Sequence, residues 1–348
     1  GDGAREDATQ ARDGAVVPAE SDDGAREDAT QARDGAVAPA EPGDGAPVDS
    51  PPAHDEPPPA AYESPGEAIA AGVLSPHFDR ARVLTIANQK GGVGKTTTAV
   101  SVSAALAELG SRVLLVDLDP QGNATSGVGV KVGPTHPTIY DVLVGGVDLE
   151  DAIEATSVRN LFVVPANLDL AGAEIELVSA FSREQKLRNA LEPIRSEYDI
   201  VLIDCPPSLG LLTVNALSAG DGLLVPIQCE YYALEGLGAL RRNADLIRAQ
   251  LNPDLDITGF VLTMLDARTR LSQQVVDEVR THFGDKVFNS RIPRSVRLAE
   301  APGFGQPITV FDPGSRGSMA YRRLAAELLQ RLVTNGPPPD RRTEGAPA

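Results

Sequence analysis

VLTIANQKGGVGKTT, which runs from Val83 to Thr97, decides the fold of this chain. Val83–Ala87 is a short apolar run with β-branched residues, which is typical of a buried strand. A glycine-rich loop follows, and then a helix-like stretch that reaches Leu109 and stops at Gly110. A strand, a glycine loop and a helix in this order predict the beginning of a parallel α/β domain.

The alternation of buried strands with helices continues along the chain. Short apolar runs predict further strands at Arg112–Val116, Leu161–Pro165, Ile200–Asp204, Gly222–Pro226, Ile257–Leu265 and Val287–Ile292. Stretches with helical character are Arg183–Arg195, Ala233–Leu251, Ser272–Phe283 and Met319–Leu332. This order predicts the α/β class, with a doubly wound, mostly parallel sheet and helices on both faces. In that architecture ligands bind at the carboxyl ends of the strands.

Negative charge is concentrated at the amino-terminal end of the chain. The whole chain carries a formal charge of -18 at pH 7. Residues 1–80 contain 18 acidic and 5 basic side chains, whereas the remainder contains 31 acidic and 26 basic ones. The remainder is therefore only mildly acidic, and a local basic patch that binds nucleic acid is compatible with its composition.

The first eighty residues have the composition of a disordered tail. DGAREDATQARDGAV occurs at Asp2–Val16 and again at Asp23–Val37, and prolines crowd the segment from Pro42 to Pro65. An acidic, proline-rich segment with few large apolar residues cannot bury enough surface to offset the entropy of ordering. We therefore predict a disordered tail over 1–80, a folded α/β domain over 81–334 and a second disordered tail over 335–348.

Cysteine content and hydropathy exclude several classes of protein. Cys205 and Cys229 are the only cysteines, so one chain can build neither a disulfide framework nor a four-cysteine metal site. The sequence contains no apolar signal segment and no apolar stretch as long as a membrane span. It predicts a cytoplasmic protein that does not insert into a membrane.

The loop Lys90–Thr97 has the features of the phosphate loop of a P-loop NTPase. Its glycines let backbone N–H groups surround a phosphate, and the N-terminus of the next helix adds a partial positive charge. Lys95 is expected to reach the β- and γ-phosphates of ATP, and the Thr96 hydroxyl to bind Mg²⁺. Gln89 stands where the standard loop has its first glycine, and an extra lysine, Lys90, follows it. The expected nucleotide contacts are Lys90, Gly91, Gly92, Val93, Gly94, Lys95, Thr96 and Thr97.

Two later strands each end in an acidic residue. Asp117 and Asp119 follow the second strand, and Ile200–Asp204 ends in Asp204. Asp204 is expected to hold Mg²⁺ directly or through water, and Asp119 to orient or deprotonate the attacking water. Both are candidate metal ligands together with Thr96, while Asp117 is expected to support the loop or the metal shell. With the phosphate loop, these residues predict an ATP hydrolase.

Several blocks of the sequence resemble one family of ATPases. KGGVGKTT resembles the deviant Walker A motif of the ParA/MinD class. From roughly Arg82 to Val333 the chain resembles the chromosomal Soj/ParA branch of that class. The blocks that carry this resemblance are DPQGNATSG (Asp119–Gly127), LAGAEIEL (Leu170–Leu177), DCPPSLGLLT (Asp204–Thr213), QCEYYALEGL (Gln228–Leu237), LTMLDARTRLS (Leu262–Ser272) and IPRSVRLAEAP (Ile292–Pro302). The acidic repeats are not part of the family pattern.

The resemblance implies a chromosome-partitioning ATPase that is switched by ATP. In this family Lys90 would reach across a nucleotide-sandwich homodimer to the partner's phosphates, which ties dimerisation to the γ-phosphate and offsets charge in the transition state. The candidate catalytic residues are therefore Lys90, Lys95 and Asp119. By the same resemblance, the ATP-bound dimer would coat nucleoid DNA, and a ParB-type centromere-binding partner would stimulate hydrolysis and release the dimer.

The resemblance also implies where DNA and the nucleotide base are contacted. Arg268 in DARTRLS and Arg297 in SVRLAE match the DNA-contacting arginines of the family. Arginines on phosphates give affinity without sequence readout, so binding to duplex DNA should be non-specific and should weaken with salt. Pro293 is a candidate adenine contact. Three further arginines lie nearby without so direct a match: Arg270, Arg280 and Arg294.

Other members of the ParA/MinD class would share the nucleotide site. A MinD-like, membrane-switched positioning ATPase is the main alternative, but it should end in a basic amphipathic helix, and NGPPPDRRTEGAPA at the carboxyl end is too polar and proline-rich. Met319–Leu332 is amphipathic, a pattern more often found in core packing. A relative with an iron–sulfur cluster between subunits would need a suitably placed cysteine pair. A DNA-binding protein without ATPase activity would not need the intact nucleotide site, and a plasmid-type ParA would need a helix-turn-helix region before the loop.

Overall fold

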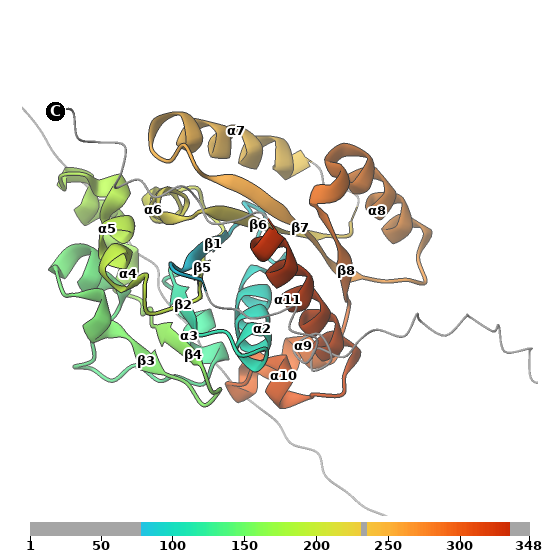
Figure 1. Cartoon of the computed structure of the whole chain (residues 1–348), viewed down its shortest axis with the longest axis horizontal. Coiled ribbons are helices and arrows are strands. Elements are labelled where there is room, and N and C mark those ends of the chain that lie inside the picture. Colours follow the sequence, from blue (N-terminus) through green and yellow to red (C-terminus); the bar gives the residue numbers. More distant parts are fainter. Residues whose placement is uncertain (1–77, 231–234, 335–348) are drawn as a thin grey trace, which may run out of the picture. The chain divides into compact units, whose positions relative to one another are not determined.

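The computed structural model describes residues 78–230 and 235–334, whose arrangement is shown in Figure 1. The chain divides into two units, Gly1–Pro58 and Pro59–Ala348, and all described residues belong to the second unit. The tails expected over 1–80 and 335–348 lie outside the described residues, except for residues 78–80. The division of the chain into tails and an ATPase domain therefore stays a prediction.

An eight-stranded sheet forms the centre of the domain, in the order β3-β4-β2-β5-β1-β6-β7-β8. The strands are β1 (Arg82–Ile86), β2 (Val113–Asp117), β3 (Glu154–Ala155), β4 (Leu161–Val164), β5 (Ile200–Asp204), β6 (Gly222–Gln228), β7 (Asp256–Leu265) and β8 (Val287–Pro293). All neighbouring strands are parallel except β3 and β4, which are antiparallel. β1, β2 and β5 are buried along their whole length, which is why most of their residues are apolar.

Helices cover both faces of this sheet (Figure 1). They are α2 (Lys95–Glu108), α3 (Asn123–Gly127), α4 (Leu170–Glu176), α5 (Lys186–Leu191), α6 (Leu211–Ala219), α7 (Glu235–Gln250), α8 (Arg270–Phe283), α9 (Val296–Glu300), α10 (Ile308–Phe311) and α11 (Arg316–Thr334), with a π-helical turn at Asp141–Gly145 and short 3-10 turns. α2 and α11 pack together and share a core with alternate sheet residues such as Leu84 and Ile86. α5 to α8 bury the opposite face, which includes Val83. The predicted doubly wound α/β class is confirmed.

The short helices α3, α4, α9 and α10 were not predicted from the sequence. Three further differences have a physical explanation. β3 is an antiparallel strand of two residues, which is too short to leave a pattern in the sequence. Arg183–Arg195 is not one helix but α5 between two 3-10 turns, because Pro193 has no N–H with which to continue an α-helix. The sequence does not predict α6, since this helix is buried on most sides and lacks an amphipathic period.

The last helix contributes to the core. Leu324 and Leu328 of α11 are fully buried, and the buried hydroxyl of Tyr321 lies 3.2 Å from that of Thr98 on α2. The interpretation of Met319–Leu332 as a core-packing helix is confirmed. Among the helices of the described residues, none has the length and apolar character needed to cross a membrane.

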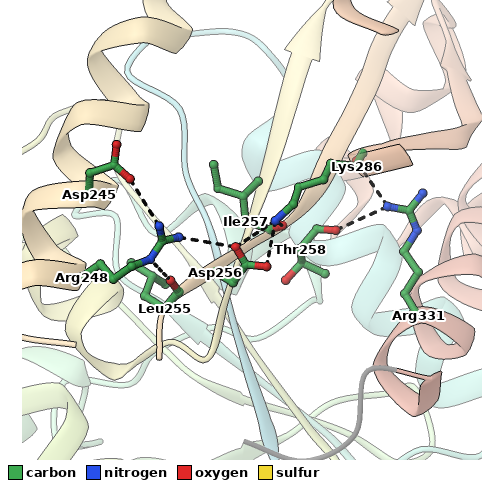
Figure 2. A network of polar contacts seen from close by, with 8 residues as sticks. All are labelled: Asp245, Arg248, Leu255, Asp256, Ile257, Thr258, Lys286 and Arg331. Carbon is green, nitrogen blue, oxygen red and sulfur yellow. Dashed lines mark hydrogen bonds and ion pairs between the residues drawn. The ribbon is translucent and has the colours of Figure 1, made fainter. Parts of the chain in front are cut away.

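A network of charged side chains joins the beginnings of β7 and β8 to α7 and α11 (Figure 2). Asp256, the first residue of β7, accepts hydrogen bonds from Lys286 at 2.8 Å and lies 3.4 Å from Arg248. Arg331 of α11 donates to the carbonyl groups of Thr258 at 3.4 Å and Lys286 at 3.3 Å. This network lies at the amino end of β7, whereas ligands of parallel sheets bind at the carboxyl ends. We therefore assign it a role in holding the outer strands together.

Candidate nucleotide site

The loop between β1 and α2 has the backbone geometry of a phosphate-binding loop. Gly92 and Gly94 have φ angles of 73° and 87°, in the left-handed region that residues with a Cβ rarely adopt. The carbonyl of Gly94 accepts a helical hydrogen bond from the N–H of Thr98 at 2.9 Å. α2 begins at Lys95, so its free N–H groups and the positive end of its dipole face the loop. An anion is stabilised at such a position.

Two side chains outside the loop hold it in this conformation. Asn88 donates to the carbonyl of Pro226 on β6 at 2.8 Å and accepts the N–H of Lys90 at 3.0 Å. Thr263 on β7 donates its hydroxyl to the carbonyl of Val93 at 2.8 Å. Both side chains are buried. Their partners on other elements are 138 and 170 residues away in the chain, so no local sequence pattern identifies either residue.

Lys95 is buried within the loop and faces its interior. Its Nζ donates to the carbonyl of Lys90 at 3.4 Å. Burial lowers the pKa of Lys95, and the negative charge of Asp204 acts in the opposite direction. A buried ammonium group within a glycine loop can contact phosphate oxygens that enter the loop.

Asp204 ends β5 at the centre of the same sheet edge. The strand register aligns it with Ile86 of β1 and with Asp117 of β2. The side chain is fully buried, and neither carboxylate oxygen has a hydrogen-bond partner among the described residues. Burial raises the pKa of Asp204 well above its usual range and Asp117 raises it further, whereas the Thr96 hydroxyl and the Lys95 ammonium favour the charged form. A buried carboxylate without a partner is costly, and a cation would relieve that cost.

The oxygen donors at this edge are of the kind that Mg²⁺ prefers. Mg²⁺ is usually held by one or two carboxylates, with water and substrate phosphates completing the shell. Asp204 provides two oxygens without a protein partner, and Thr96 provides a hydroxyl in the first turn of α2. These residues therefore fit the metal expected from the sequence.

Asp117 and Asp119 have different environments. Asp117 is fully buried and accepts hydrogen bonds from the backbone N–H and the hydroxyl of Thr125 at 2.8 and 2.7 Å. Burial raises the pKa of Asp117 to about 6. One oxygen of Asp119 accepts the N–H of Gln121 at 3.0 Å, and no described residue donates a hydrogen bond to the other. Asp117 thus joins the loop after β2 to α3, while Asp119 keeps an oxygen available to a ligand.

Lys90 lies at the margin of the site. Its Nζ is 3.6 Å from a carboxylate oxygen of Glu230, which follows β6, and both side chains are partly exposed. Pro293 ends β8, where it pairs in register with Leu265 of β7. Four of the predicted residues lie close enough to affect one another's ionisation: Lys95, Thr96, Asp119 and Asp204.

A cavity of about 290 Å³ opens beside the first turns of α2. Its lining includes Thr96 and Thr97 of α2, Leu298 of α9 and Ile308 of α10. Because it adjoins the two threonines of the phosphate loop, it offers room for the part of a nucleotide beyond the phosphates. Pro293 is not among the residues that line it.

The two candidate DNA contacts both form ion pairs with carboxylates. Arg268, in the loop after β7, has an 89% exposed side chain and donates to both oxygens of Asp266 at 2.9 Å. This contact lowers the pKa of Asp266 to about 2. Arg297 on α9 donates to Asp312 at 2.8 Å and to Glu300 at 3.0 Å. A DNA phosphate would have to displace or share these carboxylates.

The doubly wound sheet and the loop geometry at the end of β1 define the class of this protein as a P-loop nucleoside triphosphatase. The family model of the AAA domain matches residues 81–257. The sporulation initiation inhibitor protein Soj of Bacillus subtilis is 56% identical over 247 residues, which cover 71% of this chain and 98% of Soj. The chromosome partitioning protein ParA of Caulobacter vibrioides is 54% identical over 252 residues, covering 72% of this chain and 94% of that protein. The chain belongs to the ParA/Soj family of chromosome-partitioning ATPases.

Solved structures agree with this family. The cobyrinic acid a,c-diamide synthase of Mycobacterium smegmatis with bound ADP and magnesium is 40% identical, with a TM-score of 0.65 over 74% of this chain and 97% of that one. The septum site-determining protein MinD of Pyrococcus horikoshii, complexed with Mg-ADP, is 29% identical, with a TM-score of 0.57 over 71% of this chain and 96% of that one. The predictions of an ATP hydrolase and of ATP and Mg²⁺ as its ligands are confirmed. The higher identity to Soj and ParA favours a partitioning ATPase over the MinD-like alternative.

Proposed function

We propose that this chain acts in chromosome partitioning as an ATP-switched homodimer on DNA. ATP and Mg²⁺ bind at Gly91–Thr97, two subunits close face to face, and Lys90 of each subunit contacts the nucleotide of the other. The closed dimer binds duplex DNA through phosphates and without sequence preference, which keeps it at the nucleoid in the cytoplasm. A ParB-type centromere-binding protein stimulates hydrolysis, and the dimer then opens and leaves the DNA.

The residues of one subunit divide the work of hydrolysis. Lys95 binds the β- and γ-phosphates from within the loop. Thr96, Asp119 and Asp204 would hold Mg²⁺, which neutralises negative charge on the phosphates. Asp119 orients the attacking water, a role supported by its oxygen that no described residue engages. Pro293, at the end of β8, is the candidate adenine contact.

The position of Lys90 carries the proposal of a nucleotide-bridged dimer. Lys95 already supplies a cation inside the loop, whereas the ammonium of Lys90 pairs with Glu230 at 3.6 Å beside it. An ion pair between two partly exposed side chains contributes less than about 1 kcal/mol. The phosphates of a nucleotide bound to a second subunit can therefore replace Glu230 as the partner of Lys90 at little cost in free energy.

Exposed apolar side chains on and beside α4 support a face-to-face contact. Four of them are more than half exposed: Leu168, Ile175, Val178 and Phe181. The segment from Ala166 to Glu174 lies against the loops that follow β2 and β5. A Cβ on Gly122 would meet the carbonyl oxygen of Ala166, and a Cβ on Gly210 would collide with the carboxylate of Glu174. Exposed apolar groups in such a cluster indicate an interaction surface. We assign this surface to a second copy of the chain.

Replacement of Lys90 tests the dimer. Lys90→Ala should still bind ATP but remain monomeric with ATP and Mg²⁺ in size-exclusion chromatography with light scattering. Lys131→Ala, which removes another exposed lysine, is the matched control and should dimerise like the wild type. A stable ATP-dependent dimer of Lys90→Ala would contradict the role in trans.

DNA binding is tested with a random-sequence duplex, with ATP, with ADP and without nucleotide, over a series of salt concentrations. We expect binding that requires ATP, weakens with salt and is lost in the double variant Arg268→Glu/Arg297→Glu. Absence of binding under every nucleotide condition would leave the ATPase assignment intact and would exclude DNA as the surface on which the dimer acts.

A further inference from the structure

Two arginine side chains, Arg280 and Arg291, lie next to each other at the outer edge of the sheet. Arg280, near the end of α8, donates to the side-chain oxygen of Asn289 on β8 at 3.3 Å. Arg291 is two residues further along the same strand, so its side chain lies on the same face of the strand as that of Asn289. Burial lowers the pKa of Arg291, and the positive charge of Arg280 lowers it further. Because Arg280 bonds to Asn289 and Arg291 lies on the same face of β8, the two arginine side chains are neighbours on this face.

This pair lacks the counter-ion that other arginines of the domain have. Among the described residues, no carboxylate forms an ion pair with Arg280 or Arg291. Asp277, the acidic residue of α8 that acts on Arg291, accepts a hydrogen bond from Gln273 at 2.8 Å instead. By contrast, five other arginines between residues 248 and 331 form ion pairs with carboxylates: Arg248, Arg268, Arg297, Arg322 and Arg331. Two adjacent, partly buried cations disfavour each other, and a bound anion would relieve the repulsion.

The pair continues the surface that carries the candidate DNA contacts. β8 is the outermost strand of the sheet, with α8 beside it (Figure 1). Arg294 follows β8, and its N–H donates to the carbonyl of Leu265 at the end of β7 at 3.0 Å, so Arg294 lies near the loop that carries Arg268. Arg291 is three residues before Arg294, which is about 10 Å along an extended strand. Phosphates of one DNA strand advance about 3.4 Å each along the helix axis, so a single duplex can contact both positions.

We propose that Arg280 and Arg291 form a phosphate-binding site for the backbone of duplex DNA, which extends the surface of Arg268 and Arg297 along the edge of β8. The proposal rests on the proposed DNA-binding function. The site takes a phosphodiester oxygen between the two guanidinium groups, and it adds affinity without adding sequence specificity. It provides at least one phosphate contact to each subunit.

The salt dependence of DNA binding by the full chain in the presence of ATP tests this site. Because the substitution is present in both subunits of the dimer, it removes two phosphate contacts, which makes the slope of log K against log salt shallower by about 1.8. This corresponds to roughly 60-fold weaker binding at 0.1 M salt. We expect this change for Arg291→Ala and for Arg280→Ala, equally on duplexes of unrelated sequence. Arg291→Lys, which keeps the charge, should retain the slope.

Arg159→Ala is the matched control, because Arg159 is an exposed arginine that precedes β4, near the opposite edge of the sheet. Each variant should keep wild-type thermal stability and ATP-dependent dimerisation, so that a fall in affinity cannot come from misfolding. If Arg291→Ala and Arg280→Ala both bind DNA like Arg159→Ala, the site is refuted while the proposed function stands. If the wild type binds no DNA with ATP, both proposals are refuted.

Discussion

Thr263→Val removes one hydrogen bond between the sheet and the phosphate loop and leaves the shape of the side chain almost unchanged. The hydroxyl of Thr263 donates to the carbonyl of Val93 at 2.8 Å, and Thr263 is buried. Loss of such a bond, with its acceptor left in the interior, costs about 1–3 kcal/mol. If the freed loop must be ordered again when nucleotide binds, part of this cost weakens binding, and each 1.4 kcal/mol corresponds to about tenfold in the dissociation constant. We therefore expect ADP–Mg²⁺ to bind about tenfold more weakly.

Thr85→Val is the control for this prediction. Thr85 is equally buried in β1, and its hydroxyl donates to the carbonyl of Ala216 on α6 at 2.8 Å, away from the loop. Because the N–H of Gly220 also donates to that carbonyl at 2.9 Å, Thr85→Val should destabilise the fold by about 1 kcal/mol and leave nucleotide affinity unchanged. Thermal unfolding and isothermal titration calorimetry measure the two effects. If both variants lose stability but neither loses ADP affinity, the loop does not depend on Thr263 for its conformation.

Three further predictions concern single carboxyl and thiol groups, two of them buried and one exposed. Asp204 is fully buried, neither of its carboxyl oxygens has a hydrogen-bond partner among the described residues, and its raised pKa means that folding opposes its ionisation. Asp204→Asn removes this unfavourable ionisation, so it should raise the melting temperature of the nucleotide-free protein and abolish Mg²⁺-dependent hydrolysis; a lower melting temperature in EDTA would contradict this account. Burial raises the pKa of Cys229 to about 11, which lowers its thiolate fraction at pH 8 about 100-fold; a thiol reagent should label it slowly in the native protein, and the fold should lose stability as the pH rises from 9 towards 11, because the unfolded thiol ionises first. Asp256→Asn breaks the pair with Lys286 in Figure 2, but its side chain is 67% exposed, so urea unfolding should show a loss below about 1 kcal/mol that disappears in high salt.

The central strands and the phosphate loop were predictable because each depends on a local pattern. β1, β2 and β5 are buried on both faces and therefore consist mainly of apolar residues. The loop needs glycines at its left-handed positions and a lysine and threonine at the start of the helix. Asp204 was predictable because the carboxyl end of a strand in this fold faces the ligand.

Residues that act over long sequence distances could not be predicted in this way. Asn88 supports the loop through a partner on β6, and Thr263 reaches the loop from β7. The pairing of Lys90 with Glu230 depends on β6 lying beside β1. α6 and β3 were missed in the sequence for a different reason. α6 is buried on most sides and has no amphipathic period, and β3 is only two residues long. A sequence pattern identifies residues that face a ligand, whereas the contacts that orient them require the folded chain.

The unpaired carboxylate of Asp204 also bears on how long the protein survives in a cell. The buried oxygens of Asp204 have no hydrogen-bond partner among the described residues, and burial opposes its ionisation, so the folded state is less stable than it would be with a cation bound there. A ligand present at 100 times its dissociation constant adds about 2.7 kcal/mol to the stability of the folded state. Proteases degrade the transiently opened form, so the amount of folded protein should follow the supply of nucleotide. Cells depleted of ATP would then contain fewer intact copies of the protein.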